Sequence, residues 1–190
     1  MEIRKNRIKQ RLSEGKHVIA IENLNDPDIV EQFAPNNPHC FWFEGEHSIV
    51  NPQNIGDLTR AADLIGSTSI VRVPRPEYQL IYHALDLGAQ GISVPHVKSK
   101  ADAELVVKAS KFFPLGKRGM FTSRQGIGVE DYFEKANEET FVLVFIEDLV
   151  AIENLDEILE VDNIDVFFVG PGDLSQELGH TGQQNHPEVR

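Results

Sequence analysis

The chain has one cysteine and no long hydrophobic run. Cys40 is the only cysteine among 190 residues, which excludes an internal disulfide and a metal cluster held by cysteines. No apolar segment approaches the roughly 18 residues of a membrane span, and no apolar segment typical of a signal peptide follows the basic start. We therefore expect a cytoplasmic protein with no membrane partner.

Positive charge is also scarce. The chain holds 18 Lys and Arg against 30 Asp and Glu, which gives a net charge of −12. A protein this acidic is a poor electrostatic match for nucleic acid, so we expect no nucleic-acid partner. The first 16 residues are basic, but their apolar face holds only Ile3, Ile8 and Leu12. This narrow face favours a helix that closes one end of a domain over a helix on a membrane surface.

Short apolar runs alternate with helical patterns along the whole chain, which predicts a parallel α/β sheet. The predicted strands are His17–Glu22, Cys40–Glu44, Ser69–Val73, Gly91–Pro95, Phe141–Ile146 and Asp165–Gly170. Between them, Asp26 before Pro27 and Ser99 before Asp102 are typical helix starts, the latter opening a helix over 101–112. Residues 149–160 have helical apolar spacing.

The spacing of these strands is typical of a (β/α) barrel. A full (β/α)₈ barrel takes about 250 residues, and only six βα units fit here. We therefore predict that residues 1–190 form a single barrel domain whose C-terminal units are missing.

Two predicted strands end in a carboxylate. Glu147 follows the strand 141–146, and Asp173 follows the strand 165–170. An unpaired charge at the end of a buried strand is costly to desolvate, so each carboxylate needs a partner. Neighbouring parallel strands would bring the two together, with room for a divalent cation between them. Two simpler interpretations remain open: Asp173 caps the following helix, or Glu147 pairs with a buried arginine.

Other strand ends are polar as well. Glu44, Glu46 and His47 follow the second strand, and Arg72 lies at the end of the third. In a (β/α)₈ barrel the active site lies at this end of the strands. His47 as a hydrogen-bonded core residue, and Arg72 as an ion-pair partner of Glu44 or Glu46, are the structural alternatives.

Several stretches resemble the HpcH/HpaI aldolase family, the metal-dependent class II pyruvate aldolases. The resemblance runs from about residue 8 to the end of the chain. It implies a TIM (β/α)₈ barrel of the phosphoenolpyruvate/pyruvate type and a homo-oligomer, a hexamer in the full-length family. The matching stretches are EGEH at 44–47, VRVP at 71–74, ALDLGAQGISVPHV at 84–97, PLGKRG at 114–119, IENLDEIL at 152–159 and DVFFVGPGDLSQELGHTG at 165–182.

The resemblance also implies catalytic roles. His47 falls on the catalytic histidine of the family, Asp86 on the acid that orients it, and Arg72 on the arginine that faces the oxygens of the keto acid. Glu147 and Asp173 take the places of the metal ligands.

The remaining implied contacts are those of the substrate and the metal. Gly170, Pro171, Gly172 and Asp173 form the turn that receives the substrate carboxylate. Mg²⁺ or Mn²⁺ is the implied metal, with Co²⁺ as a further candidate, and these hard cations suit carboxylate ligands. The implied reaction is the reversible aldol cleavage of a 4-hydroxy-2-oxo acid to pyruvate and an aldehyde.

Two residues depart from the family pattern. Phe145 stands where the family commonly has Gln, and its side chain cannot hydrogen-bond a substrate. Glu44 stands where an Asp is usual. We also expect the loop from Gly116 to Gly128 to contribute to recognition of the substrate side chain.

Two other functions remain open. A Schiff-base aldolase could use Lys98 or Lys100, although a lysine nucleophile needs a buried site that lowers its pKa. A family member that binds a 2-oxo acid without catalysis is the other alternative, and Phe145 and the missing units favour it.

Overall fold

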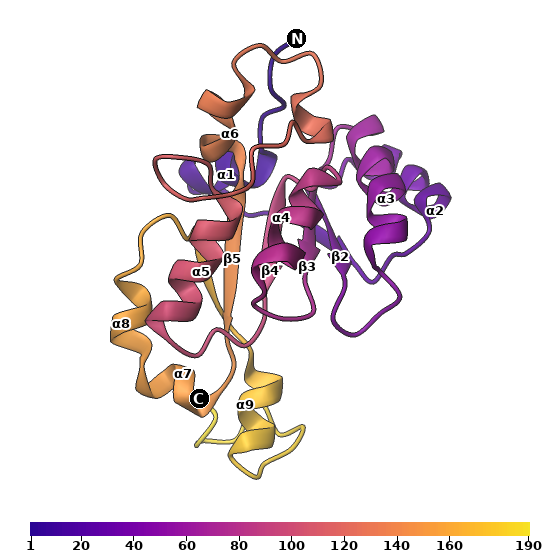
Figure 1. Cartoon of the computed structure of the whole chain (residues 1–190). Helices are drawn as coiled ribbons and strands as arrows, with labels where there is room; N and C mark the ends of the chain where they lie inside the picture. The colour runs from indigo at the N-terminus through magenta and orange to yellow at the C-terminus, as the bar shows by residue number, and fades with distance from the viewer.

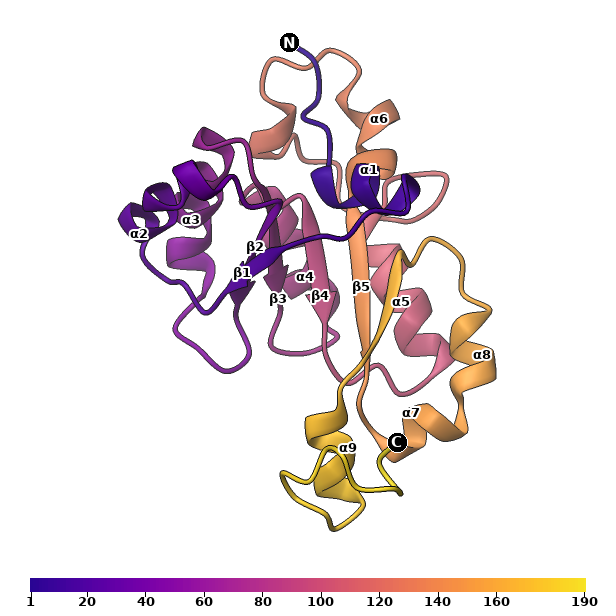
Figure 2. The ribbon, with the colours of Figure 1, turned by 180° about the vertical axis from the view of Figure 1, so that it is seen from behind.

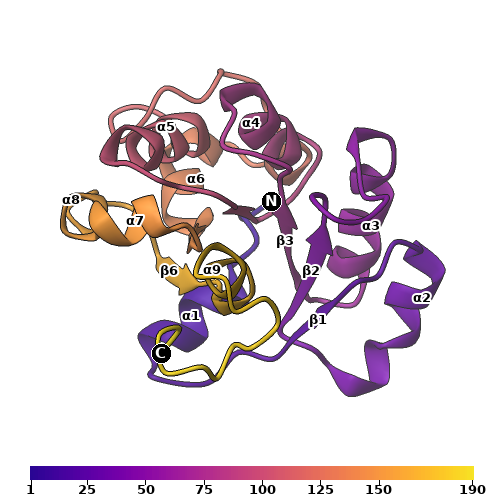
Figure 3. The ribbon, with the colours of Figure 1, turned by 90° about the horizontal axis from the view of Figure 1, so that it is seen from below.

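The computed structural model describes residues 1–190 and contains one curved sheet of six parallel strands. Their spatial order β1-β2-β3-β4-β5-β6 follows the chain order. Seen along the strands, they form an arc with helices outside it (Figure 3). The strands are β1 (Ala20–Glu22), β2 (Cys40–Glu44), β3 (Thr68–Arg72), β4 (Gly91–Val94), β5 (Phe141–Ile146) and β6 (Val166–Val169). The predicted six βα units of a barrel are confirmed.

Helices α2 to α5, α7 and α8 lie on the convex side of the sheet, while α1 and α9 lie at its two opposite ends (Figures 1 and 2). None of the helices is long and apolar enough to cross a membrane. The α-helices are α1 (Arg7–Ser13), α2 (Pro27–Gln32), α3 (Pro52–Leu64), α4 (Tyr78–Asp86), α5 (Lys100–Ser110), α6 (Tyr132–Glu139), α7 (Leu149–Glu153), α8 (Leu155–Leu159) and α9 (Pro171–Glu177). Two 3₁₀ helices span Ala34–Asn36 and Arg124–Gly126.

The helix starts follow the capping residues of the sequence. The Asp26 side chain accepts a hydrogen bond from the Asp28 N–H at the start of α2. Ser99 Oγ accepts from the Asp102 N–H at the start of α5. The helix predicted over 149–160 is instead two helices, with Asn154 between α7 and α8. Asn154 donates its side-chain amide to the Lys98 carbonyl, which ties the junction of the two helices to the start of α5.

Two apolar layers stabilise the sheet. The larger layer lies between the strands and the outer helices and includes Phe41, Phe43 and Ile92, all fully buried. The smaller one fills the concave side with Ile8, Cys40, Ile70, Phe141, Leu143 and Phe145. Ile8 belongs to α1, so this helix closes the amino ends of the strands, as the sequence predicts.

The two outer strands pair on one side only. β1 pairs with β2 and β6 with β5, so the sheet is an open half-barrel with two free edges. Phe168 and Val169 on β6 are 43% and 56% exposed, in contrast to the fully buried strand β5. The free edges explain why β6 does not have the burial expected of a central parallel strand.

A buried lysine links α5 to α6. Lys111 follows α5, is only 2% exposed, and donates from Nζ to the carbonyls of Asn137 and Thr140 at 2.8 and 2.6 Å. These carbonyls lie at the C-terminal end of α6, where helix carbonyls lack partners within the helix. Burial lowers the pKa of Lys111 from 10.5 to about 8, and the nearby charge of Lys9 contributes to the shift.

This pKa predicts a pH-dependent stability. Below pH 8 the lysine is charged in both states, so folding carries the cost of burying the charge. Between about pH 8 and 10.5 only the unfolded state stays protonated, and the free energy of unfolding therefore rises with pH, by up to about 3 kcal/mol. Lys111→Met should abolish this rise. Urea unfolding of both proteins across that range measures it, and parallel pH profiles would contradict the prediction.

Candidate active site

Charged and polar side chains gather at the carboxyl ends of the strands, the lower end in Figure 1. They come from the ends of five consecutive strands, β2 to β6. The group comprises Glu44, Glu46, His47, Arg72, His96, Glu147, Asp148 and Asp173. The carboxyl ends of parallel strands in a barrel form the usual location of an active site. The structure therefore brings together five segments of sequence that run from residue 44 to residue 173.

Arg72 is the central cation of this end of the sheet. It ends β3 with 11% of its side chain exposed, and its Nη2 lies 2.5 Å from Glu46 Oε2. The same nitrogen lies 3.5 Å from both carboxylate oxygens of Glu147, and Nη1 lies 3.6 Å from Glu44 Oε2. The Nε atom is buried without a hydrogen-bond partner in the protein.

Glu147 is the most buried carboxylate of the group, with 2% exposure. One oxygen, Oε1, accepts the backbone N–H of His96 at 3.0 Å. A Cβ added at Gly170 would lie 2.7 Å from Glu147 Cβ and 2.8 Å from Oε2, so only glycine allows β6 to end this close to the carboxylate. Burial raises the pKa of Glu147, and Asp173 raises it further, while the His96 N–H and the charge of Arg72 oppose the shift.

Asp173 approaches the same place from α9. It lies in the first turn of this helix and is exposed, while Gly170 is the N-cap. Its charge reaches Glu147 strongly enough to contribute to the raised pKa of that group. Both carboxylates therefore lie at the same end of the sheet, and their role as a pair of metal ligands stays a prediction. Asp173 makes no cap hydrogen bond, which argues against the alternative that it serves only as a helix cap.

His96 lies in the stretch 84–97 that resembles the family, but the sequence alone predicts no role for it in the site. It follows β4 with a left-handed backbone, φ +53°, which is uncommon for a residue other than glycine. Its Nδ1 lies 3.1 Å from Asp148 Oδ2, and its Nε2 lies 3.3 Å from Glu46 Oε1. Burial lowers the pKa of His96, but the hydrogen bond to Asp148 and three nearby carboxylates outweigh it and raise the pKa.

The catalytic histidine predicted from the sequence has a different partner. His47 is 67% exposed, and its Nε2 lies 3.5 Å from Glu46 Oε2. Asp86 does not reach it in this chain. Because α4 runs antiparallel to the strands, its last residue Asp86 lies at the amino ends, where it accepts from Arg118 Nη2 at 2.7 Å. Glu46, rather than Asp86, is the carboxylate beside His47.

The loop expected to recognise the substrate side chain also lies at the amino ends. α5 runs back along the sheet, so the loop Gly116–Gly128 begins beside the end of that helix, where the Lys117 N–H donates to the Lys108 carbonyl at 2.8 Å. Its Arg124 lies against Gly88, after α4. None of its hydrogen bonds within one chain reaches the residues around Glu147, so its part in substrate recognition stays a prediction.

Phe145 packs its ring against the guanidinium of Arg72. Its side chain is 6% exposed, and the Arg72 Cζ lies 4.2 Å from the centre of its ring. The ring also contacts Trp42 and Phe168, with ring centres 5.9 and 4.9 Å away. Where the family commonly has a hydrogen-bonding Gln, this chain has an aromatic face that attracts the guanidinium by a cation–π interaction.

The two lysines considered for a Schiff base are both paired. Lys98 Nζ lies 2.7 Å from Asp148 Oδ1, and Lys100 Nζ lies 2.8 Å from Glu160 Oε2. These hydrogen bonds raise the pKa of both lysines. A nucleophilic lysine needs the opposite shift, so the geometry argues against a Schiff-base mechanism.

The donor set suits a hard divalent cation. Glu44, Glu46 and Glu147 share one guanidinium, and the least exposed of them, Glu147, has a raised pKa because burial and the like charge of Asp173 disfavour its ionised form. A cation beside Glu147 and Asp173 would compensate this excess of negative charge. Carboxylate oxygens are the ligands that Mg²⁺ and Mn²⁺ prefer.

Known proteins are similar in sequence to this chain over nearly its whole length. The pattern of the HpcH/HpaI aldolase/citrate lyase family matches residues 22–190. A 2-keto-3-deoxy-L-rhamnonate aldolase of Salmonella gallinarum is 35% identical over 97% of this chain and 71% of its own length. A hydroxypyruvate/pyruvate aldolase of Pseudomonas aeruginosa is 35% identical over 100% of this chain and 73% of its own length.

Solved structures agree with the sequence comparison. The HpcH/HpaI aldolase from Desulfitobacterium hafniense superposes with a TM-score of 0.86 at 32% identity, over 96% of this chain and 73% of that one. Citrate synthase SbnG gives a TM-score of 0.86 at 34% identity, over 96% and 72% of the two chains. The prediction of an aldolase-type carbon–carbon lyase is confirmed, and the chain belongs to the HpcH/HpaI aldolase/citrate lyase family.

Proposed function

We propose that this chain catalyses the reversible, metal-dependent aldol cleavage of a 4-hydroxy-2-oxo acid to pyruvate and an aldehyde. The observation that carries the proposal is the buried carboxylate of Glu147, which lies between Arg72, the His96 N–H and Gly170 and close to Asp173. The two aldolases named above support the choice of a 2-oxo acid as the substrate class. An oligomeric assembly and a cytoplasmic location stay predictions.

Glu147 and Asp173 would hold the divalent cation, Mg²⁺ or Mn²⁺ by preference and Co²⁺ as a further candidate. When bound, the cation supplies a Lewis acid for the negative charge that develops on the keto oxygen. The N–H groups at the start of α9, in the turn Gly170–Asp173, would receive the substrate carboxylate. Because Gly170 ends β6 against Glu147, this turn and the acidic pair are held in one place.

Arg72 would add fixed positive charge beside the same oxygen. Its Nη atoms are occupied by Glu44 and Glu46, whereas its Nε is buried and unpaired. This N–H donor is already oriented, so no energy is spent on turning it when negative charge develops on the keto oxygen. Donors oriented in advance give the strongest electrostatic stabilisation. The Phe145 ring holds the guanidinium plane from the other side.

His47 would take the proton from the C4 hydroxyl of the substrate. It is exposed at the rim of the site, so a substrate can reach it, and Glu46 lies near enough to orient its ring. His96 is a positioning residue, since its N–H contacts Glu147 and its ring contacts Glu46 and Asp148.

Removal of the metal tests the proposal directly. Treatment with EDTA should abolish pyruvate release from a 4-hydroxy-2-oxo acid, and Mn²⁺ or Mg²⁺ should restore it. Glu147→Gln should lower kcat/KM by at least about 100-fold, because it removes a charged ligand, and added metal should not rescue it. Binding of pyruvate without turnover of any aldehyde in a broad panel would instead support the non-catalytic alternative.

Phe145→Leu tests the aromatic support of Arg72. Loss of a cation–π contact worth about 0.5–2 kcal/mol predicts a fall in kcat/KM of roughly 2- to 30-fold. Phe168→Leu is the matched control, because Phe168 contacts Phe145 but does not lie under the guanidinium. Steady-state kinetics with equal losses in both variants would assign the effect to packing alone.

Two substitutions of His96 separate its backbone from its ring. Asn tolerates the left-handed conformation, so His96→Asn should keep the N–H on Glu147 and bind Mn²⁺ with near-wild-type affinity. Val is β-branched and strained there by about 1–3 kcal/mol, so His96→Val should weaken Mn²⁺ binding and lower the free energy of unfolding. Calorimetric titration compares the two, and equal Mn²⁺ affinities would refute the backbone role.

A further inference from the structure

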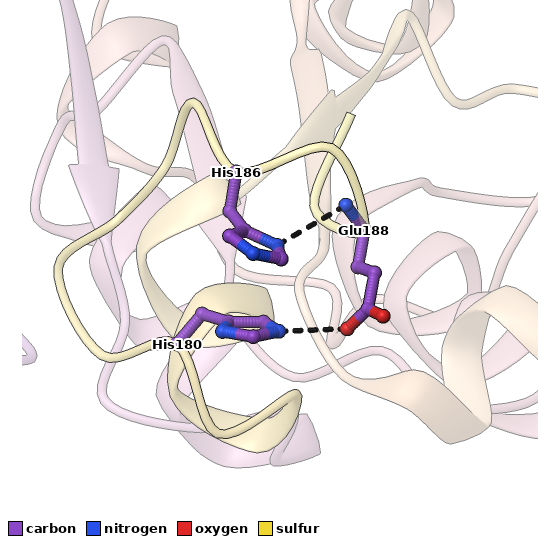
Figure 4. Close-up of side chains that lie close together, drawn as sticks. All are labelled: His180, His186 and Glu188. Carbon is purple, nitrogen blue, oxygen red and sulfur yellow. Dashed lines mark hydrogen bonds and ion pairs between the residues drawn. The ribbon is translucent and has the colours of Figure 1, made fainter.

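A second group of metal-ligating side chains lies away from Glu147, in the segment after α9. His180, His186 and Glu188 each offer one ligand atom, and the three atoms lie within 4.8 Å of one another. Figure 4 shows the two rings stacked one above the other with the Glu188 carboxylate at their edge. The candidate active site uses none of these residues.

The backbone after α9 fixes the first ligand. Gly179 has φ +77° and donates its N–H to the Gln176 carbonyl, while His180 donates to the Ser175 carbonyl at 2.8 Å. This pair of bonds is a Schellman motif, which ends a helix at a left-handed residue that is usually glycine. His180 is therefore held at a defined position just beyond the helix end, with 24% of its side chain exposed.

A series of turns brings the other two ligands back to His180. The Gln183 N–H donates to the His180 carbonyl and the His186 N–H to the Gln183 carbonyl, both at 2.8 Å. The two imidazole rings stack with centres 3.5 Å apart and an angle of 21° between their planes. Glu188 Oε2 lies 2.7 Å from His180 Nε2, and its backbone N–H donates to His186 Nδ1 at 3.3 Å.

We propose that His180, His186 and Glu188 form a second metal site, for a first-row transition dication such as Zn²⁺. Two imidazoles and one carboxylate make a donor set that suits zinc, cobalt, nickel or copper, whereas Mg²⁺ prefers oxygen ligands alone. Three protein ligands leave coordination positions for water. An ion lies in the plane of each imidazole that binds it, so the two stacked rings must rotate apart at their side-chain torsions to direct their nitrogens at one ion. The three ligand atoms start within 4.8 Å of one another, and the backbone need not move for this rotation.

A metal ion at this site would stabilise the segment that follows α9. Two of its ligands lie at 186 and 188, and the third lies at the helix end, so the bound ion joins positions up to eight residues apart. The same segment is already linked to α9 by the Gly182 N–H on Ser175 Oγ and by Thr181 Oγ1 on Gln176 Oε1. A transition ion would therefore stabilise the segment against the helix that carries Asp173.

The test is Zn²⁺ binding by the full chain and by the double variant His180→Asn/His186→Asn. Loss of a residue that only hydrogen-bonds a metal ligand weakens metal binding by roughly 10- to 100-fold. Loss of the two imidazole ligands themselves should weaken Zn²⁺ binding by at least as much. The matched control is His17→Asn/His83→Asn, which also removes two exposed imidazoles. The proposal expects the control to bind as the wild type does.

Glu147→Gln separates this site from the candidate active site. Titration with Co²⁺ should give the same absorption from nitrogen-ligated metal in wild type and Glu147→Gln, and no such absorption in the His180→Asn/His186→Asn variant. Hydrogen exchange of residues 178–190 should slow on addition of Zn²⁺ to wild type only. Equal Zn²⁺ affinity in the wild type and in the His180/His186 double variant, or an equal loss in the His17/His83 control, would overturn the proposal.

Discussion

The imbalance of charge at the carboxyl ends of the strands is the constraint on which the site depends. One guanidinium, that of Arg72, contacts Glu44, Glu46 and Glu147, and a further acid, Asp173, lies close by. Ionised carboxylates at this depth are costly unless paired, and one arginine cannot neutralise them all. The raised pKa of Glu147 reports that residual cost. A divalent cation is the simplest way to balance it.

The same constraint shapes the surrounding backbone. Gly170 is required where β6 ends against Glu147, because any Cβ would meet the carboxylate. His96 adopts a left-handed conformation and donates its N–H to Glu147. Strained backbone of this kind persists where the surrounding structure over-determines it, which is common at functional sites. The site is thus built from backbone geometry as much as from side-chain chemistry.

The aromatic residue at position 145 sets the surroundings of Arg72. A Gln there would offer hydrogen bonds, whereas Phe145 offers a flat apolar face under Arg72. The ring continues into Trp42 and Phe168, so an aromatic cluster lies directly beneath the charged layer. Low-polarity surroundings strengthen the electrostatic interactions above them and favour a fixed Arg72 over one that moves to meet the substrate.

The sequence by itself determined the six strands, their order, the capped helix starts and the polar residues at the strand ends. These features depend on local patterns, in which an apolar run ends at a polar residue and a helix begins at a capping side chain. Only the tertiary structure decided the positions of His96, Asp86 and the loop Gly116–Gly128. A sequence pattern does not show a left-handed φ at residue 96. The end of the sheet that a residue occupies depends on how its helix runs back along the strands, so Asp86 lies by Arg118 and Glu46 lies by His47.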